Sequence, residues 1–177
     1  MHVRRVVTGH DPEGKAVFVS DERMAPITLE LLPGYEFHRI WGADEAPSFP
    51  GAGAMPPHNT YFPPVGGHRF GFFTIPPAEA ASVERDMGAA LSELERKLPG
   101  MAQYMEPDGS GMHTTPTVDF EVVLSGEVIL ELDDGIEVRL QRGDTVVQNG
   151  TRHRWRNEGA TPATIAWFIC GAHHTGC

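Results

Sequence analysis

The chain has 177 residues, of which 40% are apolar, with 20 glycines, 15 prolines and a formal net charge of −10. A chain of this length buries a core without help from disulfides or metals, so we expect one domain over residues 1–177. The acidic balance disfavours nucleic acid and anionic membrane surfaces as partners, because phosphate groups bind basic faces.

The sequence also argues against export. No stretch approaches the ~18 apolar residues that a membrane span needs. The N-terminal segment has no long apolar run of the kind found in signal peptides. Only two cysteines are present, Cys170 and Cys177, so a disulfide framework is not expected. We therefore expect a cytoplasmic protein.

The N-terminal half is predicted to form short strands. Alternation of apolar residues predicts strands at 3–8, 16–20, 27–32, 35–41 and 68–75. From Pro47 to Gly67, ten of 21 residues are proline or glycine, which predicts an irregular loop. In this loop Tyr61 and Phe62 are candidates for the mouth of a cavity.

One helix is predicted, from about Ala78 to Leu98, after the Pro76-Pro77 pair. Its apolar residues recur at helical spacing and form one stripe: Val83, Met87, Leu91, Leu94 and Leu98. We interpret this stripe as the face that packs on the rest of the domain, over its outside or its mouth.

The C-terminal half has a β rhythm. Short apolar runs punctuated by glycine predict strands at 118–126, 127–135, 136–143, 144–150 and 164–171. Closely spaced strands with a single helix indicate an all-β barrel or sandwich.

The segment from His113 to Asn157 carries the strongest chemical signal. It places His113 and Asp119 near one strand and His153 on a later one. Two imidazoles and a carboxylate are sufficient to hold a divalent metal and to leave coordination positions open.

The same segment resembles the cupin superfamily. In that family the first motif runs Gly-x5-His-x-His-x(3–4)-Glu-x6-Gly, and here His113 matches its first histidine, Asp119 its glutamate and Gly126 its closing glycine. The second motif ends in Gly-x2-His-x3-Asn, which Gly150, His153 and Asn157 match after an opening Gly143.

The resemblance implies a fold. We expect a double-stranded β-helix, the cupin or jelly-roll barrel, with additional N-terminal strands and one inserted helix. The N-terminal strands and the Pro/Gly loop would occupy residues 1–75, the helix 78–98 and the core motifs 113–171.

The chain departs from the family at the metal site. The second histidine of the first motif is Thr115, and the glutamate is the shorter Asp119. The resemblance therefore implies three metal ligands instead of four: His113, Asp119 and His153. This set is the facial arrangement of non-haem Fe(II) oxygenases, so Fe(II) is favoured, and manganese, nickel or zinc are alternatives.

Other residues are candidates to complete the site. Glu121 lies two residues after Asp119, so both side chains face the same side of a strand. It is the candidate fourth ligand or general base. His38, His58 and His68 are further candidates from the N-terminal half.

The function implied is a metal-dependent enzyme that oxidises a small organic molecule, with dioxygenase chemistry as the first hypothesis. A lyase, isomerase or decarboxylase is the second, because the fold does not determine the reaction. A module that binds a small ligand without catalysis, from a barrel that has lost its metal, is the third. We also expect a homodimer that pairs the exposed N-terminal strands 3–8 or 16–20.

Overall fold

Strands dominate the structure, a computed structural model that describes residues 2–78 and 86–175. In these ranges the strands are β1 (Val3–His10), β2 (Ala16–Met24), β3 (Glu36–Ala43), β4 (His68–Ile75), β5 (Thr117–Ser125), β6 (Glu127–Glu131), β7 (Glu137–Gln141), β8 (Thr145–Asn149), β9 (Arg154–Arg156) and β10 (Ala163–Gly171). One helix, α1 (Met87–Lys97), and two 3-10 turns, Ala102–Tyr104 and Asp133–Gly135, complete the described elements.

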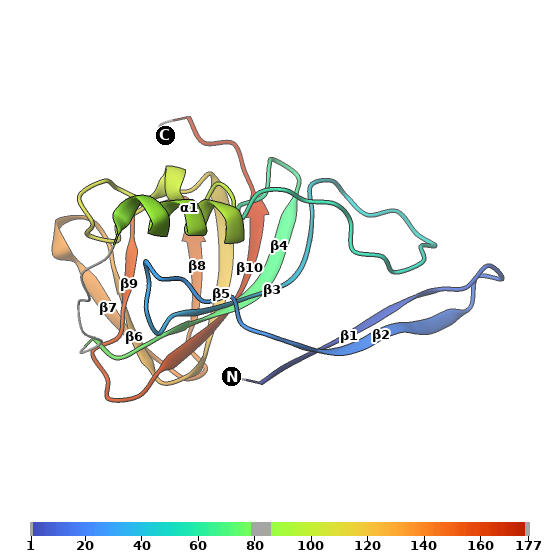
Figure 1. Cartoon of the computed structure of the whole chain (residues 1–177), viewed down its shortest axis with the longest axis horizontal. Helices are drawn as coiled ribbons and strands as arrows, with labels where there is room; N and C mark the ends of the chain where they lie inside the picture. The colour runs from blue at the N-terminus through green and yellow to red at the C-terminus, as the bar shows by residue number, and fades with distance from the viewer. Residues whose placement is uncertain (1, 79–85, 176–177) are drawn as a thin grey trace.

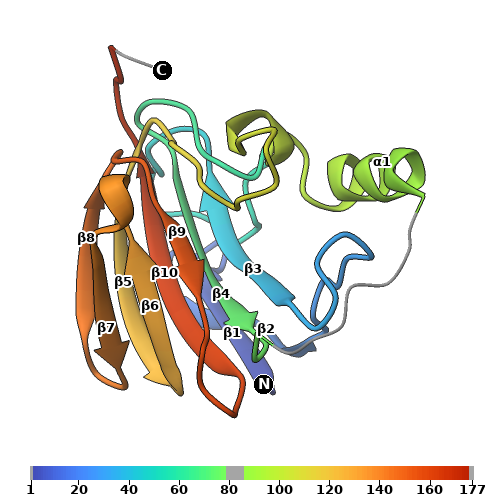
Figure 2. The same ribbon diagram turned by 90° about the vertical axis from the view of Figure 1, so that its left-hand side faces the viewer.

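Two antiparallel sheets form the barrel. The five-stranded sheet has the order β3-β4-β10-β5-β8, and the three-stranded sheet has the order β7-β6-β9. Figure 2 shows the two sheets facing one another. Between them lies a buried apolar cluster: Ile75, Val123, Val128, Leu130, Leu140, Ala163 and Ile165. The predicted all-β double-stranded β-helix, with additional N-terminal strands and one helix, is confirmed.

The N-terminal strands form a separate arm. Within the described part of the chain, β1 and β2 pair with each other alone, as a two-stranded antiparallel sheet. Figure 1 shows this arm extending away from the barrel, with part of the 44–67 loop alongside it. The loop is held to the arm by the amide of His10, which donates to the carbonyl of Gly51 at 2.8 Å.

One predicted strand is wrong. Residues 27–32 contain only an isolated bridge from Ile27 to Phe37. Leu29 is instead buried in an apolar cluster with Phe37 and with Leu94 of the helix. Since prolines lie on both sides of this segment, at 26 and 33, its leucines pack under the helix without joining a sheet.

The predicted helix is confirmed from Met87 to Lys97, whereas residues 79–85 of the prediction lie outside the described residues. The helix begins where the Asp86 side chain accepts hydrogen bonds from the amides of Gly88 and Ala89. Among the stripe residues that the structure describes, Leu94 and Leu98 are buried, while Met87 and Leu91 are exposed. The helix therefore packs on the barrel through its last turns. In the described residues no helix combines the length and apolar character needed to cross a membrane.

Candidate functional site in the barrel

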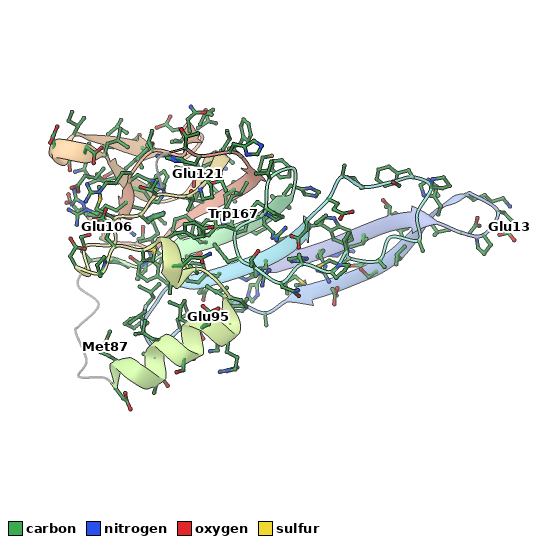
Figure 3. The ribbon with its side chains drawn as sticks, turned by 90° about the horizontal axis from the view of Figure 1, so that it is seen from above. Glu13, Met87, Glu95, Glu106, Glu121 and Trp167 are labelled. Carbon is green, nitrogen blue, oxygen red and sulfur yellow. The ribbon has the colours of Figure 1, made fainter. Side chains whose placement is uncertain are left out.

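A cavity of about 150 Å³ lies inside the barrel, and its lining is mostly aromatic and aliphatic. Its apolar walls are formed by Leu32, Tyr35, Phe37, Tyr61, Phe62, Phe73, Met101, Met105, Trp155, Trp167 and Ile169. Four lining residues carry an imidazole or a carboxyl group: His113, Asp119, Glu121 and His153. All four are among the residues that the sequence predicts for the site. Figure 3 shows Glu121 close to Trp167, inside the barrel and far from the arm.

The two histidines form a pair. The backbones of His113 and His153 make an isolated antiparallel bridge, and the ring centroids lie 4.2 Å apart. The Nδ1 atom of His113 donates to the carbonyl of Gly111 at 3.0 Å, and the Nδ1 atom of His153 donates to that of Thr151 at 2.9 Å. In a neutral ring this leaves Nε2 as the basic nitrogen, free to accept a proton or bind an ion.

The carboxyl groups come from the inward face of β5. Asp119 and Glu121 alternate with outward-facing residues, as predicted, and only 6% and 8% of their surfaces are exposed. One oxygen of each, Oδ1 of Asp119 and Oε2 of Glu121, is buried without a hydrogen-bond partner. A buried carboxyl oxygen without a partner is costly to a fold, which indicates a functional reason for these residues.

Burial shifts the pKa values of all four groups toward their neutral forms. Burial, and then the neighbouring Asp119, raises the pKa of Glu121 to about 8. Burial raises the pKa of Asp119 to about 6, although a hydrogen bond from Thr117 opposes the change. Burial, and then His113, lowers the pKa of His153 to about 4. Burial also lowers the pKa of His113. At neutral pH the cavity therefore holds two neutral imidazoles and a largely protonated Glu121.

A hydroxyl chain takes the place of the missing histidine. Thr115 is 1% exposed, and its hydroxyl lies 2.8 Å from that of Thr117. The Thr117 hydroxyl hydrogen-bonds to the carboxylate of Asp119. Since Thr117 uses its proton on Asp119, Thr115 must donate to Thr117. The threonines thus orient the carboxylate of Asp119.

The predicted three-ligand metal site is not assembled in the structure. Among residues 2–78 and 86–175, no group of three or more histidine, cysteine, aspartate or glutamate side chains is close enough to hold a metal ion. The paired histidines suit a metal, because a backbone carbonyl fixes each Nδ1 and leaves Nε2 available. The carboxylates lie in the same cavity but do not join that pair. The full set of His113, Asp119 and His153 therefore does not fit a divalent ion as folded here.

The N-terminal histidines lie elsewhere, and among the described residues none of the three lines the cavity. His38 pairs with Phe72, and His68 pairs with Cys170 and stacks on Phe168, all on the outward side of the sheet. The Nδ1 atom of His58 donates to the carbonyl of Pro56 in the loop. The sequence does not reveal which of these histidines face the cavity, because the direction of each side chain depends on the register of its strand.

Several cavity residues were not predicted. Trp167 and Ile169 alternate along β10, and Met101 and Met105 come from the segment after the helix. The sequence shows the alternation in β10. It does not show which strands pair with β10, and therefore does not tell which of its two faces lines the cavity. Tyr61 and Phe62, the candidates for the mouth of a cavity, do line it, and Trp155 lies beside them in the lining.

Comparison with known proteins identifies a cupin domain in the C-terminal part of the chain. The family Cupin_2, described as a cupin domain, matches residues 101–169. This range contains both histidines, both carboxylates and the strands from β5 to β9.

Similarity to curated proteins is local or distant. Oryzines biosynthesis cluster protein J of Aspergillus oryzae (strain ATCC 42149 / RIB 40) is 47% identical over 57 residues, 32% of this chain and 32% of that protein. The chain thus spans about a third of the length of the first curated relatives it matches. The cupin-domain-containing oxidoreductase fogC of Aspergillus ruber (strain CBS 135680) is 27% identical over 173 residues, 94% of this chain and 71% of that protein.

Among solved structures, an RmlC-like cupin family protein with a double-stranded β-helix fold from Methanocaldococcus jannaschii aligns with a TM-score of 0.38 and 11% identity. The alignment covers 60% of this chain and 71% of that one.

Proposed function

Since this chain belongs to the cupin superfamily through residues 101–169, we propose that it is an enzyme acting on a small, mainly apolar organic molecule held in the barrel. One observation carries the proposal: two unpartnered carboxyl oxygens and two neutral imidazoles share one aromatic cavity. Polar groups converging in an apolar pocket are typical of an active site.

The size of the cavity favours a small head group. The cavity has a volume of about 150 Å³, and a cleft of about 520 Å³ lies next to it. The two share Leu32, Tyr35, Gly111 and Trp155 in their walls. A molecule with its reactive group in the cavity and an apolar remainder in the cleft suits this shape.

The side chains support proton transfer. Oε2 of Glu121 has no partner to compete for its proton, so a protonated Glu121 would donate to a carbonyl oxygen of the substrate. The Nε2 atoms of His113 and His153 would accept a proton from the neighbouring carbon. The aromatic walls exclude water, which strengthens these interactions. Asp119 would be held in place by its threonines.

Deuterium exchange tests this chemistry. We would incubate phenylacetone, 4-phenyl-2-butanone and 2-indanone with the protein in D₂O and follow deuterium at the α-carbon by mass spectrometry. We expect exchange above the buffer rate for at least one ketone, and a loss of about 10²-fold or more in Glu121→Gln. Quenching of Trp155 and Trp167 fluorescence would report binding separately.

The matched control is Glu13→Gln, at the far tip of the arm (Figure 3), which should exchange at the wild-type rate. Binding without exchange in any ketone would favour a ligand-binding module and contradict the enzyme. Equal rates in Glu121→Gln and the wild type would remove Glu121 from the mechanism.

Metal-dependent oxidation is the second candidate function. It is supported by the histidine pair with its free Nε2 atoms and by the similarity to a protein named an oxidoreductase. Dioxygenase action would require Fe(II), or manganese, nickel or zinc in another reaction, at a site completed by movement of Asp119 toward the histidines.

Metal analysis distinguishes the two candidates. Protein purified without chelator should contain stoichiometric metal if oxidation is the function, and His153→Ala should lose it. His58→Ala, in the loop outside the cavity, is the matched control and should retain it. Metal-free wild type that consumes no oxygen with catechol would exclude this candidate.

A further inference from the structure

Tyr61 adds a phenol hydroxyl to the polar groups of the cavity. Its side chain lines the wall, and the residue is only 5% exposed. Within residues 2–78 and 86–175 its hydroxyl makes no hydrogen bond. A buried tyrosine hydroxyl usually has a hydrogen-bond partner. This hydroxyl is therefore available to a ligand.

The backbone around Tyr61 is fixed, although the residue lies in an irregular loop. The amide of Tyr61 donates to the carbonyl of Pro99 at 2.8 Å. The carbonyl of the preceding Thr60 accepts hydrogen bonds from Arg69 at 3.2 Å and from Arg39 at 3.3 Å. These bonds hold position 61 against the wall of the barrel.

Three aromatic side chains hold the ring of Tyr61. It meets the rings of Phe62 and Phe37 edge to face, with centroids 4.9 and 6.4 Å away. It also packs on the ring of Trp167, at 5.8 Å. Close packing on several sides restricts the rotation of a side chain. The hydroxyl therefore keeps one position in the cavity.

Trp167 links Tyr61 to Glu121. Trp167 on β10 is directly paired with Glu121 on β5, and the two side chains lie close together inside the barrel (Figure 3). The Cβ atoms of directly paired residues are about 4.5–5.5 Å apart. Because Tyr61 packs on the same indole ring, its phenol and the carboxyl group border the same part of the cavity. Oε2 of Glu121 has no partner, so the two groups are not bonded to each other there.

Both groups are donors at neutral pH. Burial raises the pKa of Tyr61 far above its ordinary value, so the phenol keeps its proton. Arg39 opposes this shift, and Asp119 and Glu121 reinforce it. The pKa of Glu121 is about 8, so this carboxyl group is also largely protonated. The cavity thus offers two O–H donors that have no acceptor within the described structure.

We propose that Tyr61 and Glu121 donate together to one carbonyl oxygen, and that the substrate is an apolar ketone or aldehyde. This inference rests on the proposed function and adds a second donor and a substrate class to it. When the C–H bond beside the carbonyl breaks, its proton passes to Nε2 of a histidine. The electron pair forms the new C=C bond and places negative charge on the oxygen. Two donors aimed at that oxygen stabilise the charge.

Asp119 favours a neutral ligand over an acid. Its pKa is about 6, so it carries a negative charge at neutral pH. It also lies near enough to Tyr61 and Glu121 to raise the pKa of both. In an apolar cavity this charge would repel a second carboxylate strongly. A ketone therefore suits the donors better than a carboxylic acid of the same shape.

Isotope-edited infrared spectroscopy tests the donors directly. Comparison of 4-phenyl-2-butanone with and without a ¹³C carbonyl isolates the C=O stretching band of the bound ketone. We expect a lower frequency than in water, because hydrogen bonds are stronger in a cavity that excludes water. Tyr61→Phe should raise the frequency. The matched control is Tyr104→Phe, which packs on Phe62 but is not among the described residues that line the cavity, and it should keep the wild-type frequency.

Exchange and binding provide independent measurements. Deuterium exchange into the same ketone should fall by about 10²-fold or more in Tyr61→Phe and stay unchanged in Tyr104→Phe. Tryptophan quenching should show that 3-phenylpropanoate, in which a carboxylate replaces the methyl ketone, binds at least about 10-fold more weakly than the ketone. Glu121→Gln, whose amide is a weaker donor, should also raise the C=O frequency, and it serves as a second variant if Tyr61→Phe fails to fold.

The outcomes separate this inference from the proposed function. A wild type that exchanges deuterium but binds the ketone with an unshifted band would overturn the donor pair and leave the enzyme. So would a Tyr61→Phe variant that matches the wild type in both band and rate. A shifted band that depends on Tyr61, without exchange, would support the donor pair and contradict the enzyme. Tighter binding of 3-phenylpropanoate, or no binding of the ketone, would overturn the substrate class.

Discussion

His113 and His153 exchange both of their backbone hydrogen bonds, at 2.9 and 3.0 Å, so the two imidazoles are held beside each other by the main chain. This pairing joins the segment before β5 to the segment before β9. The main chain therefore fixes the relative position of the two imidazoles.

His153 should make the protein sensitive to acid. Its pKa falls to about 4 in the fold, against an ordinary value of 6.5. As the pH drops from 6.5 to 4, the unfolded chain gains a proton that the native ring does not take. The contribution of His153 to the free energy of unfolding should therefore fall in this window, by up to roughly 3 kcal/mol. Urea unfolding would measure this free energy at several pH values. Between pH 6.5 and 4 it should change less with pH in His153→Gln than in the wild type. The control His10→Gln, in the arm, should keep the wild-type pH dependence.

Glu121 should lower the stability of the protein at neutral and mildly alkaline pH. Its pKa is raised to about 8, so the native side chain keeps a proton that the unfolded chain loses near 4.5. The contribution of Glu121 to the free energy of unfolding should therefore decrease as the pH rises from 4.5 to 8, opposite in sign to that of His153. Glu121→Gln should remove this decrease and be the more stable protein at pH 8. An unchanged urea midpoint profile in the variant would contradict the burial of this group.

Gly71 of β4 should be needed for the position of the Trp167 ring in the cavity wall. A Cβ added there would lie 2.3 Å from the carbonyl of His38 and 2.5 Å from the ring of Trp167. Gly71→Ala should cost about 1–3 kcal/mol of stability and displace Trp167, which lines the cavity. Gly14→Ala is not a suitable control because of its positive φ, so Gly51→Ala, with its nearest contact at 3.4 Å, serves instead. Chemical unfolding and tryptophan emission would measure both effects.

Arg69 should be a strong structural determinant, although it takes no part in the proposed chemistry. It is 1% exposed and donates to the carbonyls of Ala43, His68 and Thr60 and to the carboxylate of Asp44. Arg69→Met removes these bonds and leaves carbonyls without donors, so we expect a loss of about 2–4 kcal/mol. Arg142→Met, on an exposed turn, should change the unfolding free energy by less than about 0.5 kcal/mol.

The barrel was predictable because its strands alternate clearly. In β5 the alternation correctly put Asp119 and Glu121 on one inward face. The segment 27–32 also alternates, but its leucines pack against the helix, a tertiary contact that local patterning does not encode.

The site was predictable in composition but not in geometry. Motif spacing identified His113, Asp119 and His153, and all three reach the cavity. Whether they converge depends on side-chain direction and on Asp119 being shorter than glutamate, which spacing does not report. The homodimer stays a prediction.

The threonine chain beside Asp119 constrains how this barrel can change. A histidine at position 115 would match the family motif, yet it would displace the hydroxyl that donates to Thr117 and enter a site that is 1% exposed. The carboxylate of Asp119 would lose its orientation at the same step. Thr115→His alone should therefore destabilise the protein without building a four-ligand centre. Building a four-ligand centre in this barrel would therefore need further substitutions around position 115 that make room for the imidazole and hold Asp119 in place.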